Sequence, residues 1–183
     1  MKKYDPFIAF IFLILTLGFI FLCAFNDSFF TRVFERHQNQ WSWYIRPLFL
    51  IPFCYAALKK SLSGISITVF ALFTSMAWFN QPADVSPMVK EFLAFEMEWL
   101  KSEWTAGKIL LTLSVPFTFF CLAVACWKRN LWFGVGTLIM MATGKIVWSI
   151  SEAGESGKSI IIPAVIGLAV CIVFALMGFR KMK

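Results

Sequence analysis

The sequence has few of the residues from which metal centres and catalytic sites are usually built. A single histidine, His37, occurs among 183 residues, which excludes an HExxH helix and any site that needs several histidine ligands. No two cysteines are spaced as Cys-x-x-Cys. We therefore expect no metal, no cofactor and no disulfide framework. The five cysteines are expected to act as small buried hydrophobic residues: Cys23, Cys54, Cys121, Cys126 and Cys171.

Charged residues are also scarce, at 15% of the chain, whereas 60% of the residues are hydrophobic. Soluble globular proteins contain roughly 45–50% apolar residues. The net charge of +7 would be compatible with nucleic-acid binding. However, the basic residues occur in pairs between apolar runs and form no continuous basic stripe. The composition therefore predicts an integral membrane protein and no nucleic-acid partner.

Six apolar stretches approach the roughly 20 residues that a helix needs to cross a bilayer. The alternation of polar and apolar residues that marks membrane strands is absent, so these stretches are expected to be helices. The first is longer than the ~7–15 residues of a signal-peptide core and is expected to be retained. We predict an all-α, polytopic membrane protein that forms a single domain over residues 1–183. The predicted spans are about 7–25, 44–58, 62–79, 106–127, 131–151 and 159–179.

The basic residues in the short connections predict the orientation. With six spans, nine basic residues fall on one side of the membrane, accompanied only by Asp5. By the positive-inside rule that side is cytoplasmic. We therefore predict a multi-pass protein of a bacterial-type cytoplasmic (inner) membrane with both termini in the cytoplasm. The nine residues are Lys2, Lys3, Lys59, Lys60, Lys128, Arg129, Arg180, Lys181 and Lys183.

Two longer polar segments would then lie on the extracytoplasmic side. Residues 26–43 are too polar for lipid and are expected to form a loop. Residues 86–104 are expected to form an amphipathic helix at the outer interface, with Ser86 as its cap and Pro87 in its first turn. This helix is either a membrane anchor or a lid over a pocket. Its predicted apolar stripe is Val89, Leu93, Met97, Leu100 and Trp104.

Three cations enter the predicted outer ends of spans: Arg46, Lys108 and Lys145. A long basic side chain near the interface can simply extend towards water. Lys145 is different because it lies six residues inside its span, about 9 Å deep at 1.5 Å per residue. A charge at that depth needs a partner and indicates a functional site. Pro52, Pro116 and Pro163 each interrupt a predicted span that runs from outside to inside, and each is expected to kink its helix and open space nearby.

The candidate site is an outward-facing vestibule with polar, basic and tryptophan side chains. His37 is either a proton donor or pH-sensitive group at its mouth, or a solvated loop residue. The predicted ligand-binding residues are Arg46, Lys108, Lys145, Trp148, Glu96, Glu103 and His37.

Three classes of function fit this arrangement. The first is a binding or transport protein for a small anionic or amphipathic solute. The second is an accessory or immunity-type subunit that packs against another membrane protein or a second copy. The third is a membrane enzyme acting on a lipid at the outer leaflet, disfavoured because no paired catalytic motif is present. The sequence does not identify the solute, the coupling ion or the oligomeric state.

Overall fold

The computed structural model describes residues 3–180, with side chains through Met177. The protein is 84% helical, and no strand occurs among the described residues. This confirms the predicted all-α class. Three of the basic residues used to predict orientation, Lys2, Lys181 and Lys183, lie outside the described residues, as does the side chain of Arg180.

The chain forms two compact units, Met1–Val85 and Ser86–Lys183. The prediction of one domain over residues 1–183 remains a prediction. The first unit consists of α1 (Asp5–Phe25), α2 (Asp27–His37), α3 (Trp41–Leu48), α4 (Leu50–Leu58), α5 (Leu62–Thr74) and the 3₁₀ turn η1 (Ser75–Ala77).

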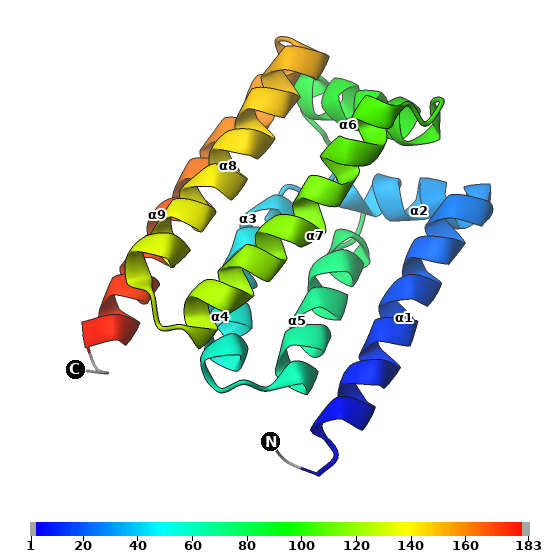
Figure 1. The fold of residues 1–183 in the computed structure, drawn as a ribbon. Helices are drawn as coiled ribbons and strands as arrows, with labels where there is room; N and C mark the ends of the chain where they lie inside the picture. The colour runs from blue at the N-terminus through cyan, green and yellow to red at the C-terminus, as the bar shows by residue number, and fades with distance from the viewer. Residues whose placement is uncertain (1–2, 181–183) are drawn as a thin grey trace. The chain divides into compact units, whose positions relative to one another are not determined.

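The first unit is organised around α1 and α5, which lie side by side (Figure 1). Phe12 and Phe70 meet edge to face between them, with ring centroids 5.6 Å apart. At the start of α5, the Asp5 carboxylate accepts hydrogen bonds from the Leu62 amide at 2.9 Å and the Ser63 hydroxyl at 2.6 Å. The first amides of a helix have no partner within the helix and carry partial positive charge. Asp5 therefore ties the beginning of α1 to the beginning of α5.

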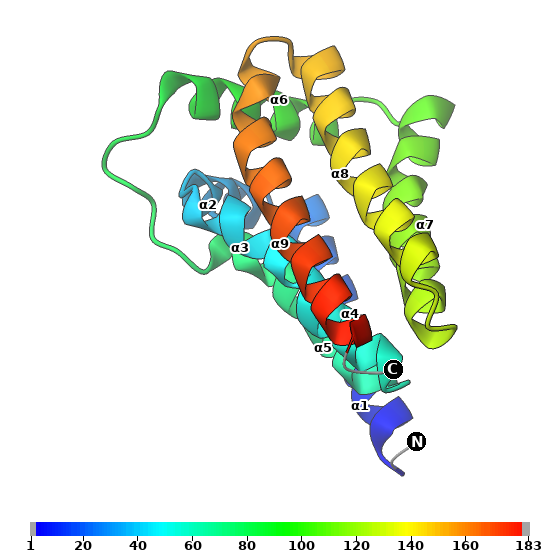
Figure 2. The same cartoon turned by 90° about the vertical axis from the view of Figure 1, so that its left-hand side faces the viewer.

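The second unit consists of α6 (Pro87–Lys101), α7 (Ala106–Trp127), α8 (Leu131–Ala153), the 3₁₀ turn η2 (Ser156–Ile160) and α9 (Ile161–Arg180). Helices α8 and α9 run side by side in opposite directions, and α6 lies against η2, the turn that joins them (Figures 1 and 2). Gly157 makes this turn possible, because a Cβ atom there would lie 2.0 Å from the Ser149 carbonyl oxygen. The close approach places η2 directly on α8.

Four helical stretches are long and apolar enough to cross a membrane: Asp5–Phe25, Ala106–Trp127, Leu131–Ala153 and Ser156–Met177. They correspond to the first, fourth, fifth and sixth predicted spans. The third predicted span contains a shorter apolar helix, Leu62–Ala77. The membrane character of the chain is thus supported, whereas the count of six spans remains a prediction.

The second predicted span is two short helices, α3 and α4, separated by Phe49 alone. The two prolines around this point explain the interruption. Pro47 and Pro52 have no amide hydrogen, so the helical hydrogen bonds that they would donate are missing. The sequence predicted a kink at Pro52, and the break is found at Phe49, within one helical turn of it.

Two predictions about the polar segments need correction. Residues 26–43 are not an irregular loop, because 27–37 form α2 and α3 begins at Trp41. The second correction is small: the helix predicted over 86–104 is found as α6, over 87–101. Of the predicted apolar stripe, Val89 and Leu93 are buried, whereas Leu100 and Trp104 are exposed, as residues facing lipid would be. Phe92, which the predicted stripe did not include, is also buried. The interfacial location of α6 remains a prediction.

Candidate functional site

The predicted site residues are divided between the two units. The first unit contains His37 and Arg46, and the second contains Glu96, Glu103, Lys108, Lys145 and Trp148. Each group is described by itself below.

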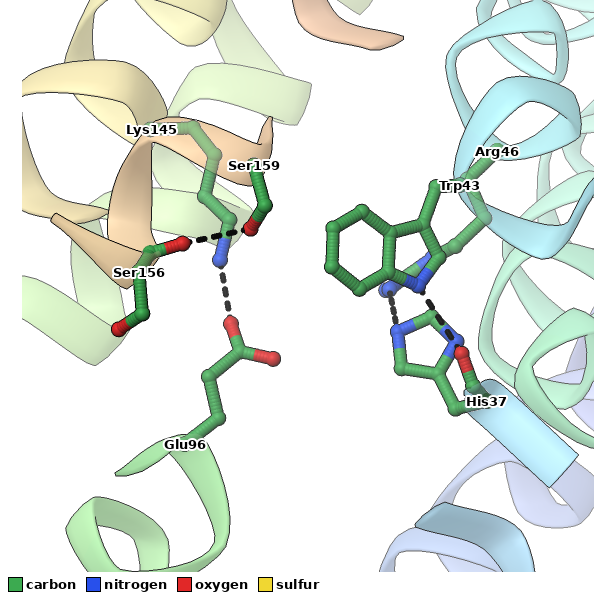
Figure 3. A network of polar contacts seen from close by, with 7 residues as sticks. All are labelled: His37, Trp43, Arg46, Glu96, Lys145, Ser156 and Ser159. Atoms are coloured by element: carbon green, nitrogen blue, oxygen red, sulfur yellow. Dashed lines mark hydrogen bonds and ion pairs between the residues drawn. The ribbon is translucent and has the colours of Figure 1, made fainter. Parts of the chain in front are cut away.

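Lys145 pairs with Glu96 in the second unit. The Lys145 ammonium in α8 and a carboxylate oxygen of Glu96 in α6 are 2.5 Å apart (Figure 3). The lysine side chain is 39% exposed and the glutamate side chain 16% exposed. The sequence indicated that a charge at the depth of Lys145 needs a partner, and Glu96 is that partner. Both groups are still partly reachable by a small molecule.

Aromatic rings surround the ion pair. The Lys145 ammonium lies 4.5 Å from the Trp148 ring centroid and 5.3 Å from that of Phe92. Trp148 also contacts Trp99 edge to face at 5.2 Å and Phe95 at 5.9 Å. Ring faces attract a cation, so these contacts add to the attraction of the carboxylate. We call this cluster the Lys145 site; it consists of Phe92, Phe95, Glu96, Trp99, Lys145 and Trp148.

Two polar atoms, one within this cluster and one on the next residue of α8, are buried without a hydrogen-bond partner among the described residues. They are the indole Nε1 of Trp148 and the hydroxyl of Ser149. Most buried polar atoms in proteins have a partner, so each exception calls for an explanation. The Ser149 hydroxyl belongs to a fully buried residue beside η2. Trp148 instead belongs to the Lys145 site, so this cluster contains a buried N–H donor without an acceptor among the described residues.

Lys108 is used in a different way. Its side chain is 7% exposed, and its ammonium donates to the carbonyl oxygens of Trp99 and of Ser102, the latter at 2.8 Å. It also lies 4.6 Å from the ring centroid of Trp104. The last carbonyls of a helix have no partner within the helix and carry partial negative charge. Lys108 therefore caps the end of α6.

The remaining predicted residue of this unit, Glu103, is exposed in the segment between α6 and α7. Lys108 and Lys145 are connected through tryptophans, because Lys108 lies 4.9 Å from the ring centroid of Trp99, which contacts Trp148. The structure thus brings Glu96, Lys145 and Trp148 together, with Lys108 at the edge of the cluster.

In the first unit, His37 is the last residue of α2 and is 3% exposed. The idea that it is a solvated loop residue is therefore wrong. The Ser42 hydroxyl donates its only hydrogen to the Asn39 carbonyl at 2.7 Å, so the Nδ1 of His37 must donate to Ser42 at 2.8 Å. The other ring nitrogen, Nε2, is then an acceptor for the Arg46 guanidinium at 3.3 Å (Figure 3).

This network holds His37 as a neutral ring with its proton on Nδ1. Trp43 closes it by donating from its indole nitrogen to the His37 carbonyl at 2.9 Å. Although a serine and a histidine are in contact, Ser42 is fully buried and its hydrogen is already donated to a backbone carbonyl. The arrangement joins α2 to α3 and does not present a nucleophile to a substrate.

Sequence reasoning missed Phe92, Phe95 and Trp99 as members of the Lys145 site. Positions 92, 96 and 99 recur at helical spacing, so they share one face of α6. A stripe chosen by hydrophobicity alone could not include the charged residue Glu96. The useful signal was a carboxylate flanked by aromatic residues at positions three and four away.

Comparisons with known proteins give no further guide to function. No protein-family model matches the chain, and neither a curated protein nor a solved structure matches it.

Proposed function

We propose that this protein is a small membrane-embedded binding or transport protein whose ligand, a small amphipathic solute, binds at the Lys145 site. In this proposal the chain crosses a bacterial-type cytoplasmic membrane six times, with both termini in the cytoplasm. Helix α6 then lies at the outer face, so the site is open to the extracytoplasmic side. Four long apolar helices support a membrane location, and the basic residues in the short connections support the proposed orientation.

The observation that carries the proposal is the indole N–H of Trp148, buried without an acceptor among the described residues. A buried donor left without an acceptor costs about 1–3 kcal/mol. A ligand that accepts this hydrogen bond removes that cost. The same ligand would reach the partly exposed Lys145–Glu96 pair, which is adjacent to the indole ring.

The surroundings of the site favour an amphipathic ligand. Its polar end would meet the indole N–H and the two charged groups. Its apolar part would contact the aromatic rings of Phe95 and Trp99, which pack on Trp148. Binding sites for small molecules commonly combine such apolar walls with a few polar groups that fix orientation.

The test is a thermal-shift screen of the detergent-purified protein against amphipathic metabolites, small anions and lipids. A ligand present at 100 times its Kd should stabilise the protein by about 2.7 kcal/mol. The decisive variant is Trp148→Phe, which keeps an aromatic ring and removes the N–H donor. The matched control is Trp132→Phe on the same helix, because Trp132 is 79% exposed.

We expect a stabilising compound for the wild type, an undiminished shift for Trp132→Phe and a reduced shift for Trp148→Phe. An equal shift in all three proteins would contradict a role for the indole N–H. The absence of any shift in the wild type would contradict the binding function and favour the accessory-subunit alternative, to be pursued by looking for a copurifying membrane protein.

The topology has its own test. Cysteines are introduced singly at Lys59, between α4 and α5, and at Asp84, before α6, in a background without the native cysteines. In intact cells an impermeant maleimide should label the cysteine at 84 and not the one at 59. Labelling of both from outside, or only of the one at 59, would overturn the proposed orientation.

A further inference from the structure

The Lys145 site holds two opposite charges that neutralise each other. Lys145 and Glu96 are in direct contact at 2.5 Å, and both are partly exposed. In a membrane environment of low dielectric constant, each charge depends strongly on the other. A ligand that binds to one of them must therefore leave the other compensated.

A ligand with a single charge cannot bind one member of the Lys145–Glu96 pair and also compensate the charge of the other. An anion that takes Lys145 away from Glu96 leaves the carboxylate without its cation, and a cation that takes Glu96 leaves the ammonium without its anion. The Glu96 side chain is only 16% exposed, and a largely buried carboxylate that loses its cation is left with an uncompensated charge, which is unfavourable. The pair thus discriminates against ligands that carry one charge only.

A ligand with both charges avoids this cost. Its anionic group can accept from the Lys145 ammonium and from the indole N–H of Trp148. Its ammonium can donate to Glu96 and lie over the rings of Phe92 and Trp148, whose centroids are 5.3 and 4.5 Å from the present position of the Lys145 ammonium. The flexible lysine side chain allows the ammonium to move aside without moving α8.

From this geometry we infer that the ligand of the Lys145 site is a zwitterion with a primary ammonium group next to a phosphate or carboxylate. The inference rests on the proposed function and specifies its ligand class. The same chemistry is found in a free zwitterionic solute and in the headgroup of phosphatidylethanolamine. A primary ammonium is required because the group that replaces the Lys145 ammonium at Glu96 must donate hydrogen bonds.

The experiment measures binding to the full-length protein in detergent micelles by thermal shift and calorimetry. The lipid probes are dihexanoyl phosphatidylethanolamine and dihexanoyl phosphatidylglycerol, which have equal chains but differ in the ammonium group. Phosphoethanolamine and glycerol phosphate are the corresponding probes without chains. In whichever of these two pairs binds to the protein, we expect the ethanolamine compound to bind at least about tenfold more tightly than the glycerol compound.

Three variants identify the cause of this preference. Glu96→Gln leaves Lys145 without its anion and should reverse the preference towards the glycerol compound. Trp148→Phe should weaken both compounds, because both use the N–H donor. The charge-reversed double variant, Glu96→Lys with Lys145→Glu, retains an ion pair and should retain the preference for ethanolamine. The double variant also keeps the test valid if Glu96→Gln fails to fold.

The outcomes separate the inference from the proposed function. If the glycerol compound binds the wild type as tightly as the ethanolamine compound, and Trp148→Phe weakens it, the zwitterion is wrong and the binding function stands. If no probe and no screened compound binds, both fail. Binding of phosphoethanolamine itself supports a free solute as the source, whereas binding of the lipid alone supports the membrane headgroup.

Discussion

The substitution Lys108→Met tests whether this buried cation supports α6 or binds a ligand. Methionine has a similar length and is compatible with an apolar environment, but it cannot donate hydrogen bonds. The change removes the cap on the Trp99 and Ser102 carbonyls at the end of α6. It also removes the cation near the ring of Trp104.

The expected loss of stability follows from these contacts. Hydrogen bonds from a charged group contribute about 1.5–3 kcal/mol, and a cation at a partly buried helix C-terminus contributes up to about 2 kcal/mol. A cation over an aromatic ring adds roughly 0.5–1 kcal/mol. These contributions overlap, because one ammonium makes all of them. We expect Lys108→Met to lower the free energy of unfolding by about 2–4 kcal/mol.

The assay is reversible unfolding in mixed micelles, with hydrogen exchange of the amides in the last turn of α6 as a local readout. Lys90→Met is the matched control, because Lys90 is on the same helix and is exposed. The control should retain wild-type stability. The interpretation is refuted if Lys108→Met is as stable as the control, or if it loses ligand binding while exchange in α6 is unchanged.

Three further substitutions have defined outcomes. Gly157→Ala should lower the free energy of unfolding by about 1–3 kcal/mol, because its Cβ would meet a carbonyl of α8; Gly136→Ala, with no atom within 4 Å, should be nearly neutral in the same unfolding assay. Ser42→Ala should cost about 1–3 kcal/mol by leaving the buried histidine without its hydroxyl acceptor. Ser114→Ala removes a hydroxyl that donates to a carbonyl of its own helix, so this control should not lower the free energy of unfolding. Asp5→Ala should speed hydrogen exchange of the first amides of α5, and unchanged exchange would contradict the capping role.

The long helices were largely predictable, because a long apolar run in a membrane must satisfy its own backbone hydrogen bonds and therefore forms a helix. Residues 106–127 were predicted as a helix and are α7, with the same bounds. The interruption at Phe49 was harder to place, since a proline disturbs the helix up to one turn before itself. The helix α2 was missed because its many polar residues were interpreted as a loop. Its helical signals were present, since Phe30, Val33, Phe34 and His37 recur at helical spacing and are buried. Asn26 also caps the helix by accepting from the Phe29 amide.

The site was predicted less completely, because its chemistry depends on which charges meet. The depth of Lys145 predicted that it needs a partner, but only the fold selects Glu96. The candidate carboxylates in the sequence were Glu96, Glu98, Glu103, Glu152 and Glu155. Lys108 has a similar sequence signal, a cation inside the end of a predicted span, although it lies less deep than Lys145. One caps a helix and the other pairs with a carboxylate. That difference arises from the path of the chain between α6 and α7, which the sequence does not reveal.

The basic turns supply a physical argument for the proposed orientation that charge counting alone cannot supply. Lys60 and Arg129 both have positive φ angles, 53° and 50°, in the left-handed region that costs a residue with a side chain roughly 1–2 kcal/mol. Glycine is the usual residue at such helix ends. Here both turns, one in each unit, have a basic residue instead. Glycine would relax the backbone of each turn but would remove a positive charge. A basic residue at both strained positions is therefore in keeping with the proposal that these two turns face the cytoplasm.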